Sequence, residues 1–183
     1  MTLVHYLAVL RGINVGGKNI IKMADLKACF EGMNFSDVAT YIQSGNVLFR
    51  STEKDKLKLA KQIEKNLSET FNYSSLVVVV PHQELQKIVE SAPKGFGSEP
   101  DKYRYDVVFL KEPLTPAEVM KQVSLKEGVD QAHAGKFAFY FSRLTSRAVQ
   151  SRLNRIASLP IYQHMTIRNW NTTTKLLALM DKA

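Results

Sequence analysis

The feature that most constrains the fold is an order of short elements that the chain follows twice. In residues 3–91 the hydrophobic spacing predicts strand, helix, two strands, helix and strand, and then one more helix. Residues 105–180 repeat this order, although few residues are identical between the two halves. A βαββαβ order is typical of the split βαβ arrangement, a four-stranded antiparallel sheet with helices on one face. The sequence therefore predicts an α+β protein built from two similar units.

In the first half, local signals place the element ends. Leu26, Cys29, Phe30 and Met33 recur at helical spacing, and Ser44-Gly45 between two apolar runs indicates a hairpin. The predicted strands are Leu3–Leu10, Val38–Gln43, Asn46–Phe49 and Leu76–Val80, and the two later helices are Lys54–Phe71 and His82–Ser91.

The second half carries equivalent signals. Thr115-Pro116 followed by Glu118 predicts a helix start with a capping box, and Ala134-Gly135 indicates another hairpin. The predicted strands are Asp106–Leu110, Val129–His133, Lys136–Phe141 and His164–Arg168, and the two later helices are Ser146–Ser158 and Asn171–Met180.

The chain length suits two small units joined by a linker. Of 183 residues, we assign 1–92 to the first unit, 93–104 to a linker rich in proline and glycine, and 105–183 to the second unit. A unit of about 80 residues with an uncovered sheet face is marginally stable. We expect the two units to bury apolar surface against each other.

The positive charge is concentrated in two segments. The formal net charge is +8, yet residues 25–130 hold 14 basic and 16 acidic side chains. Residues 1–24 and 131–180 hold 3 and 7 basic side chains and no acidic one. If these segments meet in space, they form a positive field that attracts phosphates or carboxylates. A basic surface that only keeps the protein soluble is an equally good interpretation.

The loop after the first strand has the spacing of a phosphate-binding loop without its other features. Gly12, Gly17 and Lys18 match G-x-x-x-x-G-K, but Asn19 stands where a magnesium-binding Ser or Thr is needed. The antiparallel sheet also differs from a P-loop fold, so ATP hydrolysis is not expected. An anion-binding role is open to Arg11, Asn14, Gly16, Gly17 and Lys18, as is a plain glycine turn.

Two further segments carry polar residues suited to ligand contact. Gln43, Ser44 and Asn46 lie at the first hairpin, where Ser-Gly is ordinary turn chemistry and no histidine base is identifiable for Ser44. At the closing helix, the capping side chains and two cations predict either an anion-binding site or simply a well-capped helix. These residues are Arg168, Asn171, Thr172 and Lys175.

The predicted helix Ser146–Ser158 has an unusual charge pattern. Val149, Leu153 and Ile156 share one helical face, and Arg147, Arg152 and Arg155 lie on the opposite half without an acidic residue to pair them. Solvated helices usually mix both signs of charge, whereas arginines without partners are typical of phosphate recognition.

No catalytic or metal-binding pattern is visible. The four histidines are scattered, and the single cysteine, Cys29, excludes an internal disulfide and lies on the apolar face of its helix. Phe137, Phe139 and Phe141 alternate on a predicted strand, where core packing is favoured over base stacking. We predict no cofactor and no metal, and the catalytic residues, if there are any, are unknown.

Four segments resemble a bacterial family of unknown function, domain of unknown function 1697. They are Leu10–Lys18, Lys22–Leu26, Thr40–Val47 and, at the end of the chain, Arg168–Leu176. The resemblance extends over nearly the whole chain and implies two tandem ferredoxin-like units, each with an added C-terminal helix. It implies no activity, substrate or catalytic residue.

The leading functional hypothesis is a cytoplasmic module, without a membrane segment, that binds nucleic acid or a phosphorylated small molecule. One alternative is an enzyme acting on a small anionic metabolite in a cleft between the units. Another is a protein–protein adaptor that uses the aromatic sheet face. The residues expected to contact phosphate in the leading hypothesis are Arg11, Lys18, Arg147, Arg152, Arg155, Arg168 and Lys175.

Overall fold

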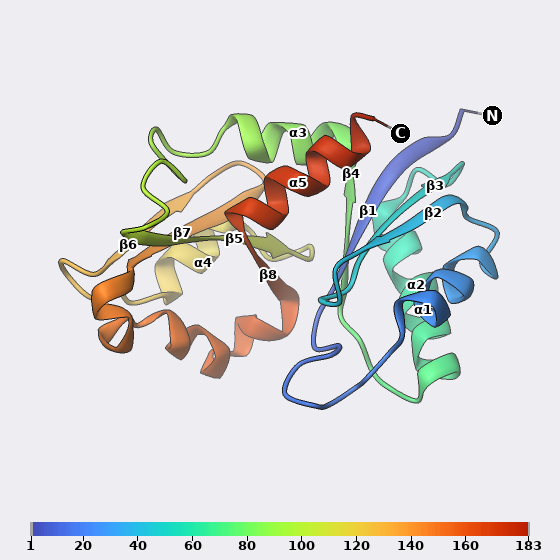
Figure 1. Cartoon of the computed structure of the whole chain (residues 1–183), viewed down its shortest axis with the longest axis horizontal. Coiled ribbons are helices and arrows are strands. Elements are labelled where there is room, and N and C mark those ends of the chain that lie inside the picture. Colours follow the sequence, from blue (N-terminus) through green and yellow to red (C-terminus); the bar gives the residue numbers. More distant parts are fainter. Residues whose placement is uncertain (1, 183) are drawn as a thin grey trace. The chain divides into compact units, whose positions relative to one another are not determined.

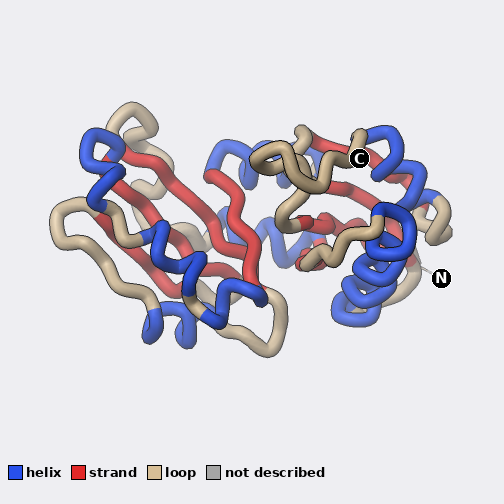
Figure 2. Tube along the Cα trace, turned by 90° about the horizontal axis from the view of Figure 1, so that it is seen from below, coloured by secondary structure: helices blue, strands red, loops and turns tan. Residues whose placement is uncertain are grey.

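The computed structural model describes residues 2–182, which form two four-stranded antiparallel sheets with associated helices (Figures 1 and 2). In the first sheet the strand order is β2-β3-β1-β4. Its elements are β1 (Val4–Leu10), α1 (Met23–Glu31), β2 (Ser36–Tyr41), β3 (Asn46–Ser51), α2 (Lys56–Phe71) and β4 (Val77–Pro81), and α3 (His82–Glu90) follows. This is the predicted βαββαβ order of a ferredoxin-like unit.

The second sheet repeats this topology with the order β6-β7-β5-β8. Its elements are β5 (Tyr103–Leu110), α4 (Pro116–Gln122), β6 (Asp130–Ala134), β7 (Ala138–Leu144), β8 (Met165–Asn169) and the closing helix α5 (Trp170–Met180). Both predicted hairpins are confirmed, because β2 pairs with β3 and β6 pairs with β7. The capping box of α4 is also confirmed, with Thr115 and Glu118 bonding to each other's backbone N–H.

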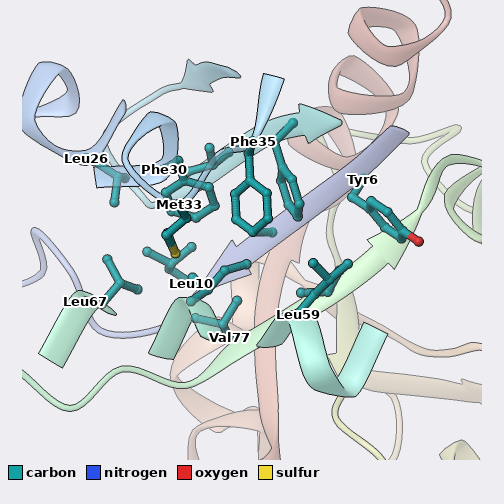
Figure 3. Close-up of a cluster of buried hydrophobic side chains, with 14 of the residues drawn as sticks. Tyr6, Leu10, Leu26, Phe30, Met33, Phe35, Leu59, Leu67 and Val77 are labelled. Atoms are coloured by element: carbon teal, nitrogen blue, oxygen red, sulfur yellow. The ribbon is translucent and has the colours of Figure 1, made fainter. Parts of the chain in front are cut away.

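The core of the first unit lies between its sheet and the two helices α1 and α2 (Figure 3). Tyr6, Ala8 and Leu10 point from β1 toward this core, as the two-residue period of a strand requires. The rings of Phe35 and Phe49 contact each other in a tilted arrangement, with centroids 4.5 Å apart. The helices contribute the buried residues Leu26, Phe30, Leu59, Ala60, Ile63 and Leu67.

In the second unit, one face of the sheet packs on α4 and on short 3₁₀ turns. Val108, Phe139 and Phe141 from the strands meet Val119 of α4 and Ile156. Phe139 and Phe141 are therefore core residues, as expected from their alternation. The other face carries Tyr140, whose hydroxyl donates to the backbone carbonyl of Ile88 in α3 at 2.6 Å.

The prediction of one α-helix over Ser146–Ser158 is wrong. The chain instead forms three 3₁₀ segments, which are η1 (Thr145–Gln150), η2 (Leu153–Ser158) and η3 (Pro160–His164), seen in Figure 1 as the orange turns before β8. Leu153 and Ile156 are buried, whereas Val149 is 94% exposed. Leu153 and Ile156 are three residues apart, so they lie on the same face of a 3₁₀ turn. Val149 belongs to the preceding 3₁₀ segment and does not share that buried face.

The predicted start of the closing helix is also corrected. α5 begins at Trp170, and its cap is Asn169, whose Oδ1 accepts from the backbone N–H of Thr172 at 2.8 Å. Asn171, the expected cap, lies inside the first turn. Asn169 ends β8 and Asn171 follows two residues later, so the sequence offers two similar capping residues and does not distinguish between them.

The fold divides the chain into two compact units at positions inside the helices. One unit holds the chain up to Leu85 and the residues from Leu179 onward, and the other is Gln86–Ala178. Each boundary therefore falls within a helix, α3 or α5. Between residues 2 and 182, no helix combines the length and the apolar character that a membrane span needs.

Candidate functional site

In the first unit, the glycine loop between β1 and α1 has a geometry different from that of a P-loop. Val15 and Lys18 form an isolated bridge, and the backbone N–H of Lys18 donates to the Val15 carbonyl at 3.0 Å. Gly16 and Gly17, with φ of 58° and 72°, occupy the tip of this small hairpin, where positive φ is required. The N–H of Lys18 is thus used within the turn and does not face an anion.

Asn14 holds this loop against the neighbouring hairpin. Its Nδ2 donates to the carbonyls of Ile21 at 3.0 Å and Gln43 at 2.9 Å. Its Oδ1 accepts from the backbone N–H of Ile21 at 2.8 Å. Both amide hydrogens and the oxygen are therefore occupied, so Asn14 acts as a structural clamp.

Asn46 has a comparable structural role at the hairpin. It is fully buried, and its Nδ2 donates to the Tyr41 carbonyl and to Ser44 Oγ, each at 3.0 Å. The side chains of Gln43 and Lys18 are exposed, and Arg11 is half-buried. The loop also exposes Val15 and Ile20, which leaves a cationic and apolar tip.

Arg168 is buried in the second sheet. It is 8% exposed, and its guanidinium donates to Thr166 Oγ1 at 3.1 Å and to the Ile167 carbonyl at 2.8 Å. Burial lowers the pKa of Arg168 to about 10. A guanidinium enclosed in this way is held by the fold, and we leave it out of the surface described next.

A cavity of ≈250 Å³ lies at the end of the second sheet, beside the start of α5. Tyr103, Tyr105 and Trp170 give it aromatic walls, and Arg104 adds a guanidinium. The remaining lining residues are Gly97, Pro100, Thr145, Asn169 and Asn171. Of the residues predicted around the closing helix, Asn171 lines this cavity, Thr172 is buried beside the cap, and Lys175 is exposed.

An aromatic cluster holds the walls of this cavity in place. The ring of Phe96 makes edge contacts with Tyr105, Tyr140 and Trp170 at centroid distances of 4.9, 5.5 and 5.2 Å. Edge-to-face contacts of this kind are favourable beyond the area that they bury. The backbone of Gly97 lies so close to Trp170 that an added Cβ would be 2.3 Å from the indole.

Arg104 lines this cavity, and four further arginines belong to the same unit; we call these five residues the arginine edge. Arg104 and Arg143 are opposite each other on β5 and β7, and Arg143 contacts Asn154 at 3.5 Å. Arg152 donates to the Leu125 carbonyl at 3.2 Å. The arginine edge comprises Arg104, Arg143, Arg147, Arg152 and Arg155.

Most of these arginines have no carboxylate partner. Within residues 2–182, no carboxylate lies at ion-pair distance from the guanidinium of Arg147, Arg152 or Arg155. Arg147 and Arg155 are also exposed. The expected absence of acidic partners therefore holds for these three residues, although they do not share one α-helix.

One buried carboxylate does balance part of the arginine edge. Asp106 is 2% exposed and lies 3.3 Å from Arg104 Nε. Burial raises the pKa of Asp106, and the charges of Arg104 and Arg143 oppose that shift. The middle of the chain, which supplies Asp106, thus neutralises part of the positive field.

A second acidic residue, Asp130, fixes the backbone of the arginine edge. Its Oδ2 accepts from the backbone N–H groups of Lys126 at 2.9 Å and Arg152 at 2.8 Å. Its Oδ1 is buried and accepts no hydrogen bond from any described residue. Asp130 therefore holds the junction between η1 and η2 against β6.

The predicted residues fall into two groups, one in each unit. The glycine loop and the first hairpin share one end of the first unit, whereas the arginines after residue 140 and Asn171 belong to the second. The cavity is not predicted from the sequence, where Tyr103 and Arg104 are assigned to a linker. The alternation Tyr103-Arg104-Tyr105 before an apolar run was the signal that could have revealed this strand.

Comparisons with known proteins agree with the fold. A family described as "Protein of unknown function (DUF1697)" matches residues 3–140. The structure is similar to that of the conserved bacterial protein SP0830 from Streptococcus pneumoniae, with a TM-score of 0.82, 25% identity, and coverage of 97% of this chain and 98% of that one. No curated protein matches the chain. Since the family match spans most of its length, the chain belongs to the DUF1697 family, and its fold is two tandem ferredoxin-like units.

Proposed function

We propose that the protein is a cytoplasmic module that binds single-stranded nucleic acid through the arginine edge and the cavity that Arg104 lines. The observation that carries this proposal is that Arg147 and Arg155 are exposed and have no carboxylate partner among the described residues. Exposed guanidiniums without a partner leave the molecule with an unbalanced local charge, which phosphate groups balance well.

The cavity suits a nucleotide of the same strand. Proteins that bind single strands combine a cationic track for the backbone with aromatic side chains on which bases stack. Tyr103, Tyr105 and Trp170 offer aromatic surface, and Arg104 and Asn171 offer donors beside it. The volume of ≈250 Å³ is small for a whole nucleotide but adequate for a base.

The first test is fluorescence anisotropy with a labelled single-stranded DNA oligonucleotide at low salt. The double variant Arg147→Gln/Arg155→Gln should bind at least about tenfold more weakly than the wild type, because two phosphate contacts are lost. The salt slope of log affinity should also fall by about 1.4, since each single-strand phosphate contributes roughly 0.7.

The matched control is Lys61→Gln/Lys121→Gln, which removes two exposed cations from α2 and α4 outside the arginine edge. This variant should bind nearly as the wild type does. Equal weakening in both double variants would show attraction by net charge alone and would overturn the proposed surface. Thermal stabilisation by mononucleotides without any oligonucleotide binding would favour the small-metabolite alternative.

A further inference from the structure

The largest cavity described, ≈500 Å³, lies in the first unit and is lined by two histidines. His5 on β1 and Arg50 on β3 are directly opposite in the sheet, and His82 follows the end of β4, the strand on the other side of β1. The rings of His5 and His82 have centroids 6.2 Å apart. The rest of the lining includes Thr2, Gln83, Met180 and Asp181.

Each imidazole is oriented by a hydrogen bond from the fold. His82 Nε2 lies 2.6 Å from Asp181 Oδ1, a contact between residues 99 positions apart. His5 is hydrogen-bonded to the backbone of Met180. In each ring one nitrogen is therefore held by the protein, and the second can exchange a proton with a ligand.

The surroundings of the two histidines differ in a way that suits opposite proton-transfer roles. Burial, followed by the charges of Arg50 and His82, lowers the pKa of His5, while Asp37 opposes this shift. A neutral imidazole at His5 can accept a proton. At His82 the Asp181 carboxylate lies 2.6 Å from Nε2 and can accept that N–H, which leaves the other ring nitrogen for proton transfer.

Arg50 supplies a positive charge beside the two rings. Its Nε lies 3.2 Å from Asp37 Oδ2 at the neighbouring strand, although that N–H is not aimed at the oxygen. The side chain remains 29% exposed and lines the cavity. A guanidinium here can stabilise the negative charge of a phosphoryl group.

We propose that this cavity cleaves RNA phosphodiesters by general acid–base catalysis, with His5 as base and His82 as acid. His5 accepts the proton of the ribose 2′-hydroxyl as its oxygen bonds to phosphorus. The bond from phosphorus to the 5′-oxygen breaks, and that oxygen takes the proton from His82. The products are a 2′,3′-cyclic phosphate and a 5′-hydroxyl, and proton exchange with water restores both imidazoles.

RNA fits this arrangement because its own 2′-hydroxyl supplies the nucleophile. A base and an acid that act on the attacking and leaving oxygens need hydrogen bonds of about 2.6–3.2 Å to two atoms on opposite sides of phosphorus. Rings 6.2 Å apart are compatible with that spacing. A cavity of ≈500 Å³ can accept a dinucleotide end. Asp181 would be a positioning residue for His82.

The test is cleavage of a fluorogenic RNA dinucleotide in the presence of a chelator. Wild type should cleave it with a bell-shaped pH profile, and His5→Gln and His82→Gln should each lose roughly 100-fold or more in rate. Asp181→Ala should slow cleavage more than Asp181→Asn does, because the asparagine keeps an oxygen that can accept the His82 N–H. The corresponding DNA dinucleotide should remain intact.

A second readout does not depend on turnover. NMR of the imidazole signals should show both His5 and His82 shifting when the uncleavable DNA dinucleotide is added to the wild type. Absence of cleavage by the wild type, unshifted imidazole signals, or variants as active as the wild type would each overturn the proposal. Lys61→Gln/Lys121→Gln, which changes exposed cations outside both this cavity and the arginine edge, should keep full activity on the dinucleotide.

Discussion

Gly97 is the residue at which backbone conformation and packing both depend on the absence of a side chain. Its φ is +84°, and a Cβ would lie 2.3 Å from the Trp170 ring. We predict that Gly97→Ala lowers the free energy of unfolding by about 2–4 kcal/mol, because strain at positive φ and overpacking add. Urea denaturation measures this change.

Gly95→Ala is the matched control for the packing part of that effect. Gly95 has φ +80°, but the nearest atom to an added Cβ is Ser98 Oγ at 3.6 Å. The control should cost only about 1 kcal/mol, from the backbone conformation alone. Equal losses in the two variants would show that Trp170 is free to move away and that the cavity wall is not rigid.

At the same scale, single residues were the part of the site that the sequence predicted least well. Arg168 was expected to contact an anion because its charge has no acidic neighbour in the chain, but the strand register buries it. His5 and His82 are counted among four scattered histidines, since the contact between His82 and Asp181 across 99 residues leaves no periodic signal. The pairing of β1 with β4 brings the two histidines together, and the end of α5 adds Asp181.

The positions of helices and strands were predicted well where the hydrophobic period and a residue that ends the element agree. The five-residue apolar run Leu76–Val80, which Pro81 ends, corresponds to β4, and the lysine-rich segment Lys54–Phe71 corresponds to α2. The prediction of an α-helix over Ser146–Ser158 is wrong because it depended on the helical spacing of three apolar residues. Nothing in that spacing reveals that the Arg152 N–H is bonded to Asp130 and not to the preceding turn.

The role of Asp130 at this junction is testable. We predict that Asp130→Ala lowers the free energy of unfolding by about 2–4 kcal/mol, because two partly buried backbone N–H groups lose a charged acceptor. Asp130→Asn, which keeps an oxygen, should cost clearly less. Chemical denaturation compares the variants, and an alanine variant as stable as the wild type would contradict the assigned role.

Stability of the whole molecule should depend on pH through His5. Its pKa in the folded protein is lower than the ordinary 6.5, because of burial and of Arg50 and His82. The unfolded chain then binds more protons, so this contribution to stability is complete above pH 6.5 and is lost as the pH falls through the folded pKa. Two carboxylates lie near these groups. Asp37 opposes the lowering of the His5 pKa, and Asp181 contacts His82.

The measurement is thermal or urea unfolding of the wild type and His5→Gln across the pH range from about 5 to 8. The wild type should lose more stability than the variant as the pH is lowered. Because all other titrating groups are shared, the difference between the two curves reports His5. Parallel curves would contradict the lowered pKa.

The last residues of the chain belong to the first unit, which affects how the two units can be separated for study. That unit includes the residues from Leu179 onward, so Asp181 comes back to hold His82 after the whole second unit has been traversed. A fragment truncated after residue 92 would keep all four strands of the first sheet yet lose the carboxylate that orients one imidazole. The first unit is thus discontinuous, and separating it cleanly would require re-joining the chain ends, as in a circular permutant.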